Sequence, residues 1–264
     1  MGLLKVEVVE GRVCLVTLLN DYNGQPQFPW GTSVAEHRLN FLLMGELNAA
    51  LDLALSNPEV SSVVVTGQGK FFSNGMDLQF LDAHLQQANA MQKQAELLLA
   101  RLLGFPLPTV AAINGHFCAA GAMFGLAFDF RIMTTTRGLF FVPGVDIGLA
   151  YSPGMTSLLK SKLPVHMHVD MICFAKRYTA KDLLEEKLLF AVAPTAEEVV
   201  RVGLQHALML TGKTRFLGPK YRDTLGRIKQ NTFADTLALL LDETTVFAMG
   251  FEAQAWGDGG RSRI

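Results

Sequence analysis

The chain has 264 residues, 50% of them hydrophobic and 18% charged, a composition that supports a sizeable core and excludes intrinsic disorder. Its 23 Lys and Arg residues nearly balance 24 Asp and Glu residues, so no overall field attracts nucleic acid or an anionic membrane. The three cysteines have neither CxxC spacing nor an even count, and we therefore expect neither a disulfide framework nor a structural zinc site.

The chain begins with patterns typical of a hairpin followed by a helix. Two alternating segments, 4–9 and 13–19, flank a short turn and predict paired strands. After a polar insertion over residues 20–32, leucines spaced by three and four residues predict a helix over 34–55. The sequence Ser56-Asn57-Pro58 ends that helix.

The same strand and helix patterns recur further along the chain. A β-branched run at 63–65 is typical of a buried parallel strand. The segments that follow are helical stretches near 77–85 and 91–103, a strand at 109–113, a small-residue helix through Ala127 and a strand at 130–134. We therefore expect an α/β core of repeated ββα units.

One apolar stretch, residues 105–128, is long enough to suggest a membrane span because it carries no formal charge. Pro106, Pro108 and Asn114-Gly115 interrupt it, however, and divide it into a strand, a turn and a helix. We therefore expect a buried core segment and no membrane span.

The pattern beyond Ser152 is helical almost throughout, with long segments at 195–210 and 233–249. No linker or low-complexity tract divides the chain. We expect a core over residues 1–194 that holds the functional site, followed by a helical C-terminal layer over residues 195–264.

Two loops rich in small residues, 69–78 and 114–122, each lie between a predicted strand and the start of a predicted helix. Backbone N–H groups at a helix N-terminus lack intrahelical partners and can hold an oxyanion, and small side chains let a ligand approach. Either loop alone is equally well explained by a turn or by tight helix packing. Together they predict an oxyanion-binding site.

Three stretches in and beyond these loops, 66–78, 108–116 and 145–149, resemble the crotonase (enoyl-CoA hydratase/isomerase) superfamily, and within it the peroxisomal Δ3,Δ2-enoyl-CoA isomerases. The resemblance implies a spiral of ββα units that binds an acyl-CoA thioester and is usually a homotrimer or a hexamer. It implies a trimerisation or covering role for the C-terminal helices, and no metal or redox cofactor.

The resemblance also implies the roles of individual residues. The N–H groups of Met76 and Ala120 would form the oxyanion hole. His37 and Arg38 would lie along the CoA nucleotide, although Arg38 is as well explained by an exposed helix start. The substrate would further contact residues of the two loops and of the helix after the second loop, namely Ser73, Asn74, Gly75, Asp77, Leu78, His116, Gly121 and Met123.

Two departures from the family pattern concern acid and base groups. Met123 stands where hydratases carry the first of two glutamates, and a thioether cannot act as a base, so hydration is disfavoured. Gly144 stands where the isomerases carry their single carboxylate. Loss of a general base forfeits about 10²- to 10⁴-fold in rate.

Other groups near position 144 are candidates for the missing base. Asp146 is the nearest carboxylate, and on an extended strand it would lie on the same face as Gly144 but about 6.5 Å away. Tyr151 and His116 are further candidates, and Asp82 and Glu96, on helices that cover the acyl pocket in the family, are weaker ones.

Three functions therefore stay open. The first is an isomerase that shifts a 3-enoyl-CoA double bond to the 2-trans position through a dienolate. The second is a catalytically silent acyl-CoA-binding relic, and the third is another enolate-forming reaction on a CoA thioester. Substituting Gly144→Glu should raise isomerase activity, unless a positive φ explains the glycine.

The sequence ends in Ser262-Arg263-Ile264 after a glycine-rich tail. This triplet resembles a variant of the peroxisomal Ser-Lys-Leu address and predicts recognition by the peroxisomal import receptor. An ordinary terminus on a cytoplasmic protein is the alternative.

Overall fold

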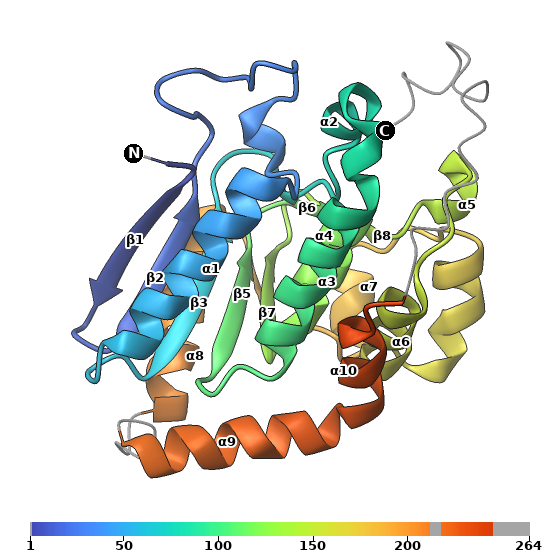
Figure 1. The fold of residues 1–264 in the computed structure, drawn as a ribbon. Coiled ribbons are helices and arrows are strands. Elements are labelled where there is room, and N and C mark those ends of the chain that lie inside the picture. The colour runs from blue at the N-terminus through green and yellow to red at the C-terminus, as the bar shows by residue number, and fades with distance from the viewer. Residues whose placement is uncertain (1, 212–217, 245–264) are drawn as a thin grey trace.

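The computed structural model describes residues 2–211 and 218–244, and its centre is a twisted six-stranded sheet in the order β1-β2-β3-β5-β7-β9 (Figure 1). The strands are β1 (Leu4–Val9), β2 (Val13–Leu18), β3 (Ser62–Gly67), β5 (Thr109–Ile113), β7 (Phe130–Thr134) and β9 (Ala191–Ala193). The pair β1–β2 is the predicted antiparallel hairpin, and every other neighbouring pair is parallel.

A second, smaller parallel sheet lies at one end of the first and has the order β4-β6-β8. Its strands are β4 (Phe71–Ser73), β6 (His116–Cys118) and β8 (Phe140–Phe141). Each follows a strand of the large sheet, as in β3–β4, β5–β6 and β7–β8, and a helix comes next. This arrangement confirms the predicted repeat of ββα units, although the short second strands had not been located individually.

The helices complete the units and form the C-terminal region. They are α1 (Phe41–Ser56), α2 (Leu78–Ala83), α3 (Ala88–Leu103), α4 (Ala120–Ala127), α5 (Gly144–Ile147), α6 (Pro153–Lys162), α7 (Ala180–Glu185), α8 (Ala196–Thr211), α9 (Pro219–Thr232) and α10 (Ala234–Leu241). Three 3₁₀ turns, Val34–Glu36, Leu85–Gln87 and Val165–Met167, and a π-helical turn, His168–Cys173, join them. None of the helices described is long and apolar enough to cross a membrane.

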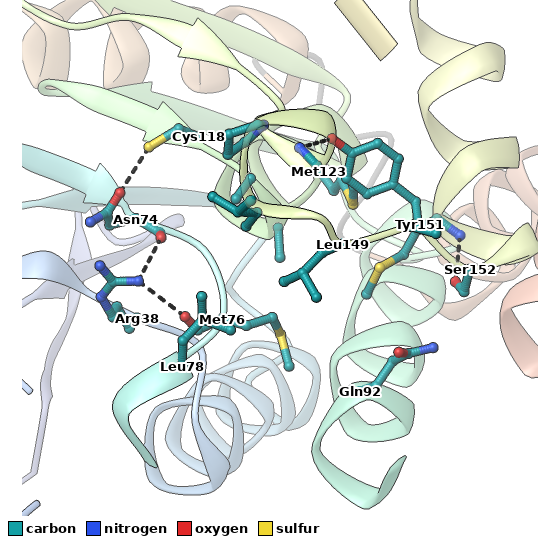
Figure 2. Close-up of a pocket in the computed structure, with 17 residues that line it drawn as sticks. Arg38, Asn74, Met76, Leu78, Gln92, Cys118, Met123, Leu149, Tyr151 and Ser152 are labelled. Atoms are coloured by element: carbon teal, nitrogen blue, oxygen red, sulfur yellow. Dashed lines mark hydrogen bonds between the residues drawn. The ribbon is translucent and has the colours of Figure 1, made fainter. Parts of the chain in front are cut away.

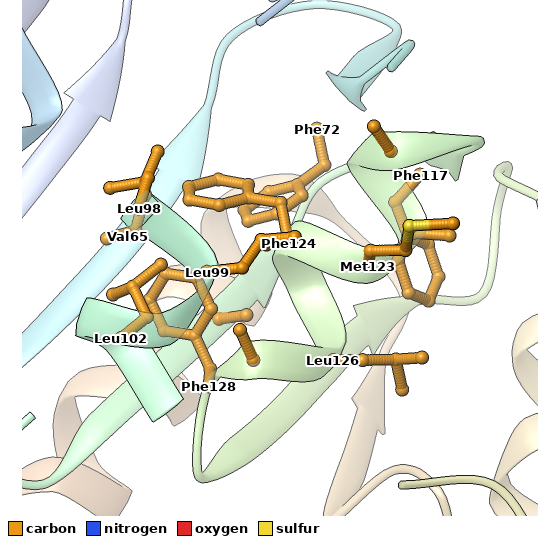
Figure 3. Packing of buried hydrophobic residues seen from close by; sticks show 14 of the residues in the cluster. Val65, Phe72, Leu98, Leu99, Leu102, Phe117, Met123, Phe124, Leu126 and Phe128 are labelled. Carbon is orange, nitrogen blue, oxygen red and sulfur yellow. The ribbon is translucent and has the colours of Figure 1, made fainter. Parts of the chain in front are cut away.

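The larger hydrophobic core lies between the sheet and helices α1, α3 and α4. Figure 3 shows the part that α3 and α4 contribute. Phe72 and Phe124 stack with ring centroids 5.5 Å apart, and Phe128 meets Phe124 edge to face at 5.2 Å. Leu98 and Leu99 of α3 are buried in the same cluster. Aromatic pairs of this geometry add to the free energy gained by burying apolar area. This packing fixes the start of α4 relative to β4.

Helix α8 packs on the opposite face of the sheet, where a second cluster includes Val64, Val110 and Ile132 (Figure 1). Gly203 of α8 faces this cluster, and a Cβ there would make an ordinary van der Waals contact with Ala112 at 3.4 Å. The sheet is thus covered on both faces, as expected for parallel strands rich in β-branched residues.

Helix α9 crosses one end of the sheet and is joined to the rest of the molecule by two cations (Figure 1). Arg222 donates hydrogen bonds to Leu55 O at 2.9 Å and to Val60 O at 2.6 Å. Leu55 lies in the last turn of α1, where carbonyls lack donors within the helix. Lys229 donates to Leu107 O at 2.9 Å and pairs with Asp129 at 2.6 Å.

The first long helix begins later than predicted, at Phe41 and not at residue 34. The side chain of Asn40 accepts a hydrogen bond from Leu43 N at 3.0 Å and caps the helix, while His37 has a φ of 48° that breaks the preceding turn. At the other end of the chain, α10 covers 234–241 of the predicted 233–249 helix, and residues 245–249 lie outside those described.

Candidate active site

The first predicted oxyanion loop runs from the end of β4 into α2. Gly75 has a φ of +87°, and its carbonyl accepts a hydrogen bond from Leu39 N at 2.7 Å, while Asp77 N donates to Leu39 O at 3.1 Å. This bridge fixes Met76 between its neighbours. No described residue accepts a hydrogen bond from the Met76 N–H, which leaves it available to a ligand.

The second loop runs from β6 into α4. Ala119 has a φ of 54° and donates to Phe141 O at 3.0 Å, and Ala120 is the first residue of α4. The Ala120 N–H has no acceptor among the described residues, as expected at the N-terminus of a helix. The helix dipole adds a partial positive charge there.

Glycine permits the two loops to touch. A Cβ at Gly75 would lie 2.7 Å from the Cβ of Ala119, and one at Gly121 would lie 2.7 Å from the Ser73 carbonyl carbon and closer still to its oxygen. Both distances are too short for real side chains. The sequence therefore brings the two N–H donors to the same place by removing side chains where the loops cross.

Asp77 anchors the first loop through hydrogen bonds. Its buried carboxylate accepts four hydrogen bonds: from Thr32 Oγ1 at 2.5 Å, Trp30 Nε1 at 2.9 Å, Asn40 Nδ2 at 3.0 Å and Phe80 N at 3.1 Å. The last of these caps α2. The carboxylate thus anchors the loop, and Asp77 does not line the cavity described next.

A mainly apolar cavity of about 90 Å³ opens beside the two loops (Figure 2). The lining consists of Arg38, Asn74, Met76, Leu78, Gln92, Cys118, Ala119, Ala120, Met123, Pro143, Gly144, Ile147, Leu149, Ala150, Tyr151, Ser152 and Met155. The structure thus brings together eight of the residues predicted from the sequence: Arg38, Asn74, Met76, Leu78, Ala120, Met123, Gly144 and Tyr151. The others lie outside the lining, namely Ser73, Gly75, Asp77, His37, His116, Gly121, Asp146, Asp82 and Glu96.

Arg38 is engaged with the protein. Its Nη1 donates to Met76 O at 3.2 Å and to Asn74 O at 3.3 Å, and its Nε pairs with Glu36 at 2.5 Å. The side chain is 19% exposed. Arg38 therefore clamps the oxyanion loop from the cavity side, a role that the sequence did not predict.

His37 and His116 lie behind the loops. His37 Nδ1 is 2.9 Å from Phe71 O, and burial lowers the pKa of His37 to about 4, so its ring is neutral. His116, on β6, packs against the Phe71 ring, and burial together with Lys70 and Arg137 lowers its pKa. Both residues support the loops from outside the cavity.

Tyr151 explains the glycine at position 144. The Gly144 N–H donates to the Tyr151 hydroxyl at 2.5 Å (Figure 2). A Cβ at Gly144 would fall 2.5 Å from Tyr151 Cζ and from Leu149 O, and closer still to the hydroxyl oxygen. The φ of Gly144 is not positive, so the reason for glycine is space and not backbone conformation. The phenol thus occupies the place in which a side chain at position 144 would begin.

Asp146 is exposed and does not line the cavity. Our placement of Asp146 assumed an extended backbone, but residues Gly144–Ile147 form the short helix α5. Two positions along a helix differ by about 200° in direction, whereas two positions along a strand share a face. The side chain of Asp146 therefore points away from that of position 144.

Several cavity residues were not predicted from the sequence, among them Gln92, Cys118 and Ser152. Cys118 donates to Asn74 Oδ1 at 2.9 Å, and burial raises the pKa of its thiol to about 12, which makes it inert. Ser152 caps α6 by accepting from Met155 N at 3.1 Å, and the Ser-Pro pair at a helix start was a usable signal for it.

Glu96 lies directly behind the cavity wall, buried on α3. Ser152 Oγ donates to its Oε1 in a short hydrogen bond, and Gln92 Nε2 donates to the same oxygen at 3.3 Å. Burial raises the pKa of Glu96, and these two hydrogen bonds oppose that effect. Asp82, the other carboxylate considered on a covering helix, is exposed.

The site can polarise a carbonyl oxygen between two backbone N–H groups in an apolar environment, where such donors are most effective. None of the lining residues carries a carboxylate. No group of three His, Cys, Asp or Glu side chains in residues 2–211 and 218–244 is arranged to hold a metal ion.

Comparison with known proteins identifies the family of the chain. The family model described as enoyl-CoA hydratase/isomerase matches residues 36–225. Enoyl-CoA delta isomerase 3 of Arabidopsis thaliana is 36% identical over 137 residues, which are 50% of this chain and 58% of that protein. The peroxisomal enoyl-CoA delta isomerase 2 of the same plant is 28% identical over 82% of this chain and 92% of its own.

Proteins named as hydratases match too, for instance 2,3-dehydroadipyl-CoA hydratase of Escherichia coli, 27% identical over 68% of each chain. Among solved structures, an enoyl-CoA isomerase of Mycobacterium tuberculosis superposes with a TM-score of 0.73 at 24% identity, over 90% of this chain and 94% of its own, which shows the shared fold. Since the family model covers well over half of its length, the chain belongs to the enoyl-CoA hydratase/isomerase family of the crotonase superfamily.

Proposed function

We propose that this protein binds a fatty acyl-CoA and moves a 3-enoyl double bond to the 2-trans position through a dienolate. The observation that carries the proposal is that Met76 and Ala120 both line one apolar cavity and that their N–H groups lack acceptors among the described residues. Two such donors stabilise the negative charge that develops on a thioester oxygen when a C2 proton leaves.

The cavity lining favours isomerisation over hydration. Hydration needs a water held and activated by acidic groups, and Met123 lines the cavity where such a group would be required. Isomerisation only moves a proton between two carbons of the bound chain, and an apolar wall suits it because competing water is excluded. The relatives named as delta isomerases support the same choice.

A catalytically silent acyl-CoA-binding protein is the second candidate. Gly144 favours it, because no side chain at that position can accept a proton and the Tyr151 phenol fills the space. Burial raises the pKa of Tyr151 to about 12, so the phenol is protonated at neutral pH and is not a base. Both candidates require acyl-CoA binding, and they differ only in turnover.

An assay of the purified protein with 3-enoyl-CoA and with 2-enoyl-CoA tests the proposal. We expect isomerisation of the first substrate above the uncatalysed rate, and hydration of the second at background. A hydration rate comparable with the isomerisation rate would refute the isomerase assignment.

Binding without turnover would instead support the silent protein. Calorimetric titration with octanoyl-CoA, for which we expect micromolar affinity, measures binding separately. Absence of both heat and thermal shift would exclude both candidates.

We further propose a peroxisomal location and a trimeric or hexameric assembly in which residues 195–264 contribute to contacts or cover the site. The names of two Arabidopsis relatives include the word peroxisomal, which supports the location. The triplet Ser262-Arg263-Ile264 lies outside the described residues. A fluorescent reporter carrying this triplet should reach peroxisomes, and light scattering should give about three or six times the 28.9 kDa chain mass.

A further inference from the structure

Glu96 is a buried carboxylate with incomplete pairing. Its exposed fraction is 0%, and its Oε2 has no hydrogen-bond partner among residues 2–211 and 218–244. The nearest cation is Lys93, whose Nζ lies 3.9 Å away and donates instead to the carbonyls of Leu240 at 2.9 Å and Asp242 at 2.8 Å. Burying an incompletely paired carboxylate costs free energy, whereas an amide of the same shape would avoid that cost. The cost of burying this carboxylate indicates that Glu96 has a functional role.

The other oxygen of Glu96 is connected to the cavity. Its Oε1 accepts hydrogen bonds from Ser152 and Gln92, both of which line the cavity. Gln92 and Glu96 lie one turn apart on α3, so their side chains share a face of that helix. Figure 2 shows Gln92 on α3 and Ser152 at the start of α6 on the side of the cavity opposite Met76. Of these two groups, only the Ser152 hydroxyl can pass a proton from the cavity to Glu96.

We propose that Ser152 and Glu96 form a proton relay that takes the place of the carboxylate absent from position 144. The proposal rests on the proposed isomerase function. Ser152 is the catalytic residue that meets the substrate carbon, and Glu96 is the positioning residue that activates it. A hydroxyl is a weak base alone and becomes an effective one beside a group that removes its proton.

The relay balances in both directions. Ser152 Oγ takes the proton from C2 while its own hydroxyl proton passes to Glu96 Oε1. The electrons of the C2–H bond form a C1–C2 double bond, and the charge moves to the thioester oxygen, held by the N–H groups of Met76 and Ala120. Ser152 then gives its proton to C4 and recovers one from Glu96, which leaves the double bond between C2 and C3. No oxidant, reductant or water is consumed.

The surroundings of Glu96 make it a stronger base than an exposed glutamate, because its pKa is raised. Burial is the largest influence on its pKa and raises it, with a smaller contribution from Asp242, while Ser152, Gln92 and Lys93 lower it. A base whose pKa approaches the working pH transfers protons most effectively.

The other carboxylates are less suited to the task. Glu36 also contacts cavity residues, but it pairs with Arg38 at 2.5 Å and accepts from the Asn74 amide at 2.9 Å, and neither partner relays a proton. Asp146 and Asp82 are exposed and do not line the cavity. Among the described carboxylates, Glu96 alone accepts a hydrogen bond from a hydroxyl that lines the cavity.

Two variants test the relay. Glu96→Gln keeps the shape and the acceptor oxygen but removes the base. Ser152→Gly removes the hydroxyl, and glycine is itself a tolerated residue at the start of a helix. We expect each to lower kcat for isomerisation about 10²- to 10⁴-fold with octanoyl-CoA affinity changed less than threefold. The double variant should lose little more than either single one, because the two groups act as one unit.

The pH profile separates a relay from a structural role. Wild-type kcat/KM should fall at low pH as Glu96 becomes protonated, and this limb should be absent from the residual activity of Glu96→Gln. The matched control is Glu185→Gln, the same substitution at an exposed position of α7, which should leave both rate and profile unchanged. Unchanged activity in Glu96→Gln, or a lower rate that keeps the low-pH limb, would overturn the relay.

A second readout keeps the relay distinguishable from the isomerase assignment. Exchange of the C2 protons of octanoyl-CoA in D₂O reports removal of the C2 proton without any double-bond shift. If the wild type exchanges these protons but does not isomerise, and Glu96→Gln stops the exchange, the relay stands and the isomerase assignment fails. If the wild type does neither, both are wrong.

Discussion

The Tyr151 phenol occupies the space in which a side chain at position 144 would begin, and this changes the expected effect of substitution there. Gly144→Glu by itself should not raise isomerase activity, contrary to the expectation from sequence. Its Cβ would overlap the phenol, and overpacking of this kind costs about 1 to 3 kcal/mol. We expect a lower midpoint of thermal unfolding for both Gly144→Ala and Gly144→Glu.

Removing the phenol supplies the control. In a Tyr151→Gly background, Gly144→Glu should cost less stability than in the wild type, because the ring is gone and only the overlap with the Leu149 carbonyl remains. Equal losses of stability in the two backgrounds would contradict the steric explanation.

His37 makes stability depend on pH. Burial lowers its pKa from 6.5 to about 4, so the unfolded chain binds a proton in this range that the folded chain does not. About 3 kcal/mol of stability is therefore present above pH 6.5 and lost as the pH falls towards 4. His37→Asn, which tolerates the φ of 48°, should flatten this dependence in urea unfolding at pH 7 and pH 4.5. The prediction fails if both proteins lose stability equally.

At this scale, the small residues between a strand and a helix indicated the two loops, and the family resemblance assigned the N–H groups of Met76 and Ala120 within them. Neither signal indicated the groups around Glu96. The contact between Glu96 and Ser152 joins positions 56 residues apart, and no local pattern indicates such a pair. Tyr151 was considered as a base. Its contact with Gly144 was not predicted, because it depends on how the chain between residues 144 and 151 folds back on itself.

At the scale of elements, the turn into α4 stores strain. Ala119 has a φ of 54° and a ψ of −131°, a conformation that costs a residue with a Cβ about 1 to 3 kcal/mol. Ala119→Gly should raise the free energy of unfolding by about 1 kcal/mol after the greater entropy of the unfolded glycine is included. It should also lower isomerase kcat several-fold, because the neighbouring Ala120 N–H is held less rigidly.

Ala122, inside α4, provides a matched control for this substitution. Ala122→Gly should lower the free energy of unfolding by about 1 kcal/mol, since glycine is unfavourable within a helix. Chemical denaturation compares the two variants directly. The same sign of change in both would show that Ala119 is not strained.

Long elements could be predicted from sequence and short ones could not. The hairpin and the strands at 63–65, 109–113 and 130–134 were predicted because their patterns extend over several residues. The strands of the small sheet have only two or three residues, and α5 has four, too few to show a period. The misplaced start of α1 has a specific cause, since the apolar pattern continues through Leu39 although the cap is Asn40.

At the scale of the whole molecule, α9 is joined to the core by a nearly buried ion pair. Asp129 Oδ2 accepts from Lys229 at 2.6 Å and from Thr109 N at 2.8 Å, and the Lys229 side chain is 8% exposed. Asp129→Asn leaves the lysine charged and unpaired, so we expect a loss of about 3 to 5 kcal/mol in urea unfolding. Lys229→Met should cost less, because Thr109 still binds Asp129 and the replacement packs as an apolar chain.

The double variant of these two residues is the decisive measurement. Its loss should be smaller than the sum of the single losses, since no unpaired charge remains. Additive losses would mean that the two residues act independently of each other.

The contact between Tyr151 and Gly144 also constrains how this chain can change by descent. If glutamate replaces glycine at position 144 first, its side chain overlaps the Tyr151 phenol. If the phenol is lost first, a void remains and the Gly144 N–H loses its acceptor. Each single step is unfavourable, and the two together still leave the overlap with the Leu149 carbonyl. Among close relatives, a residue larger than glycine at 144 should therefore accompany both a smaller residue at 151 and a different course of the backbone at 149.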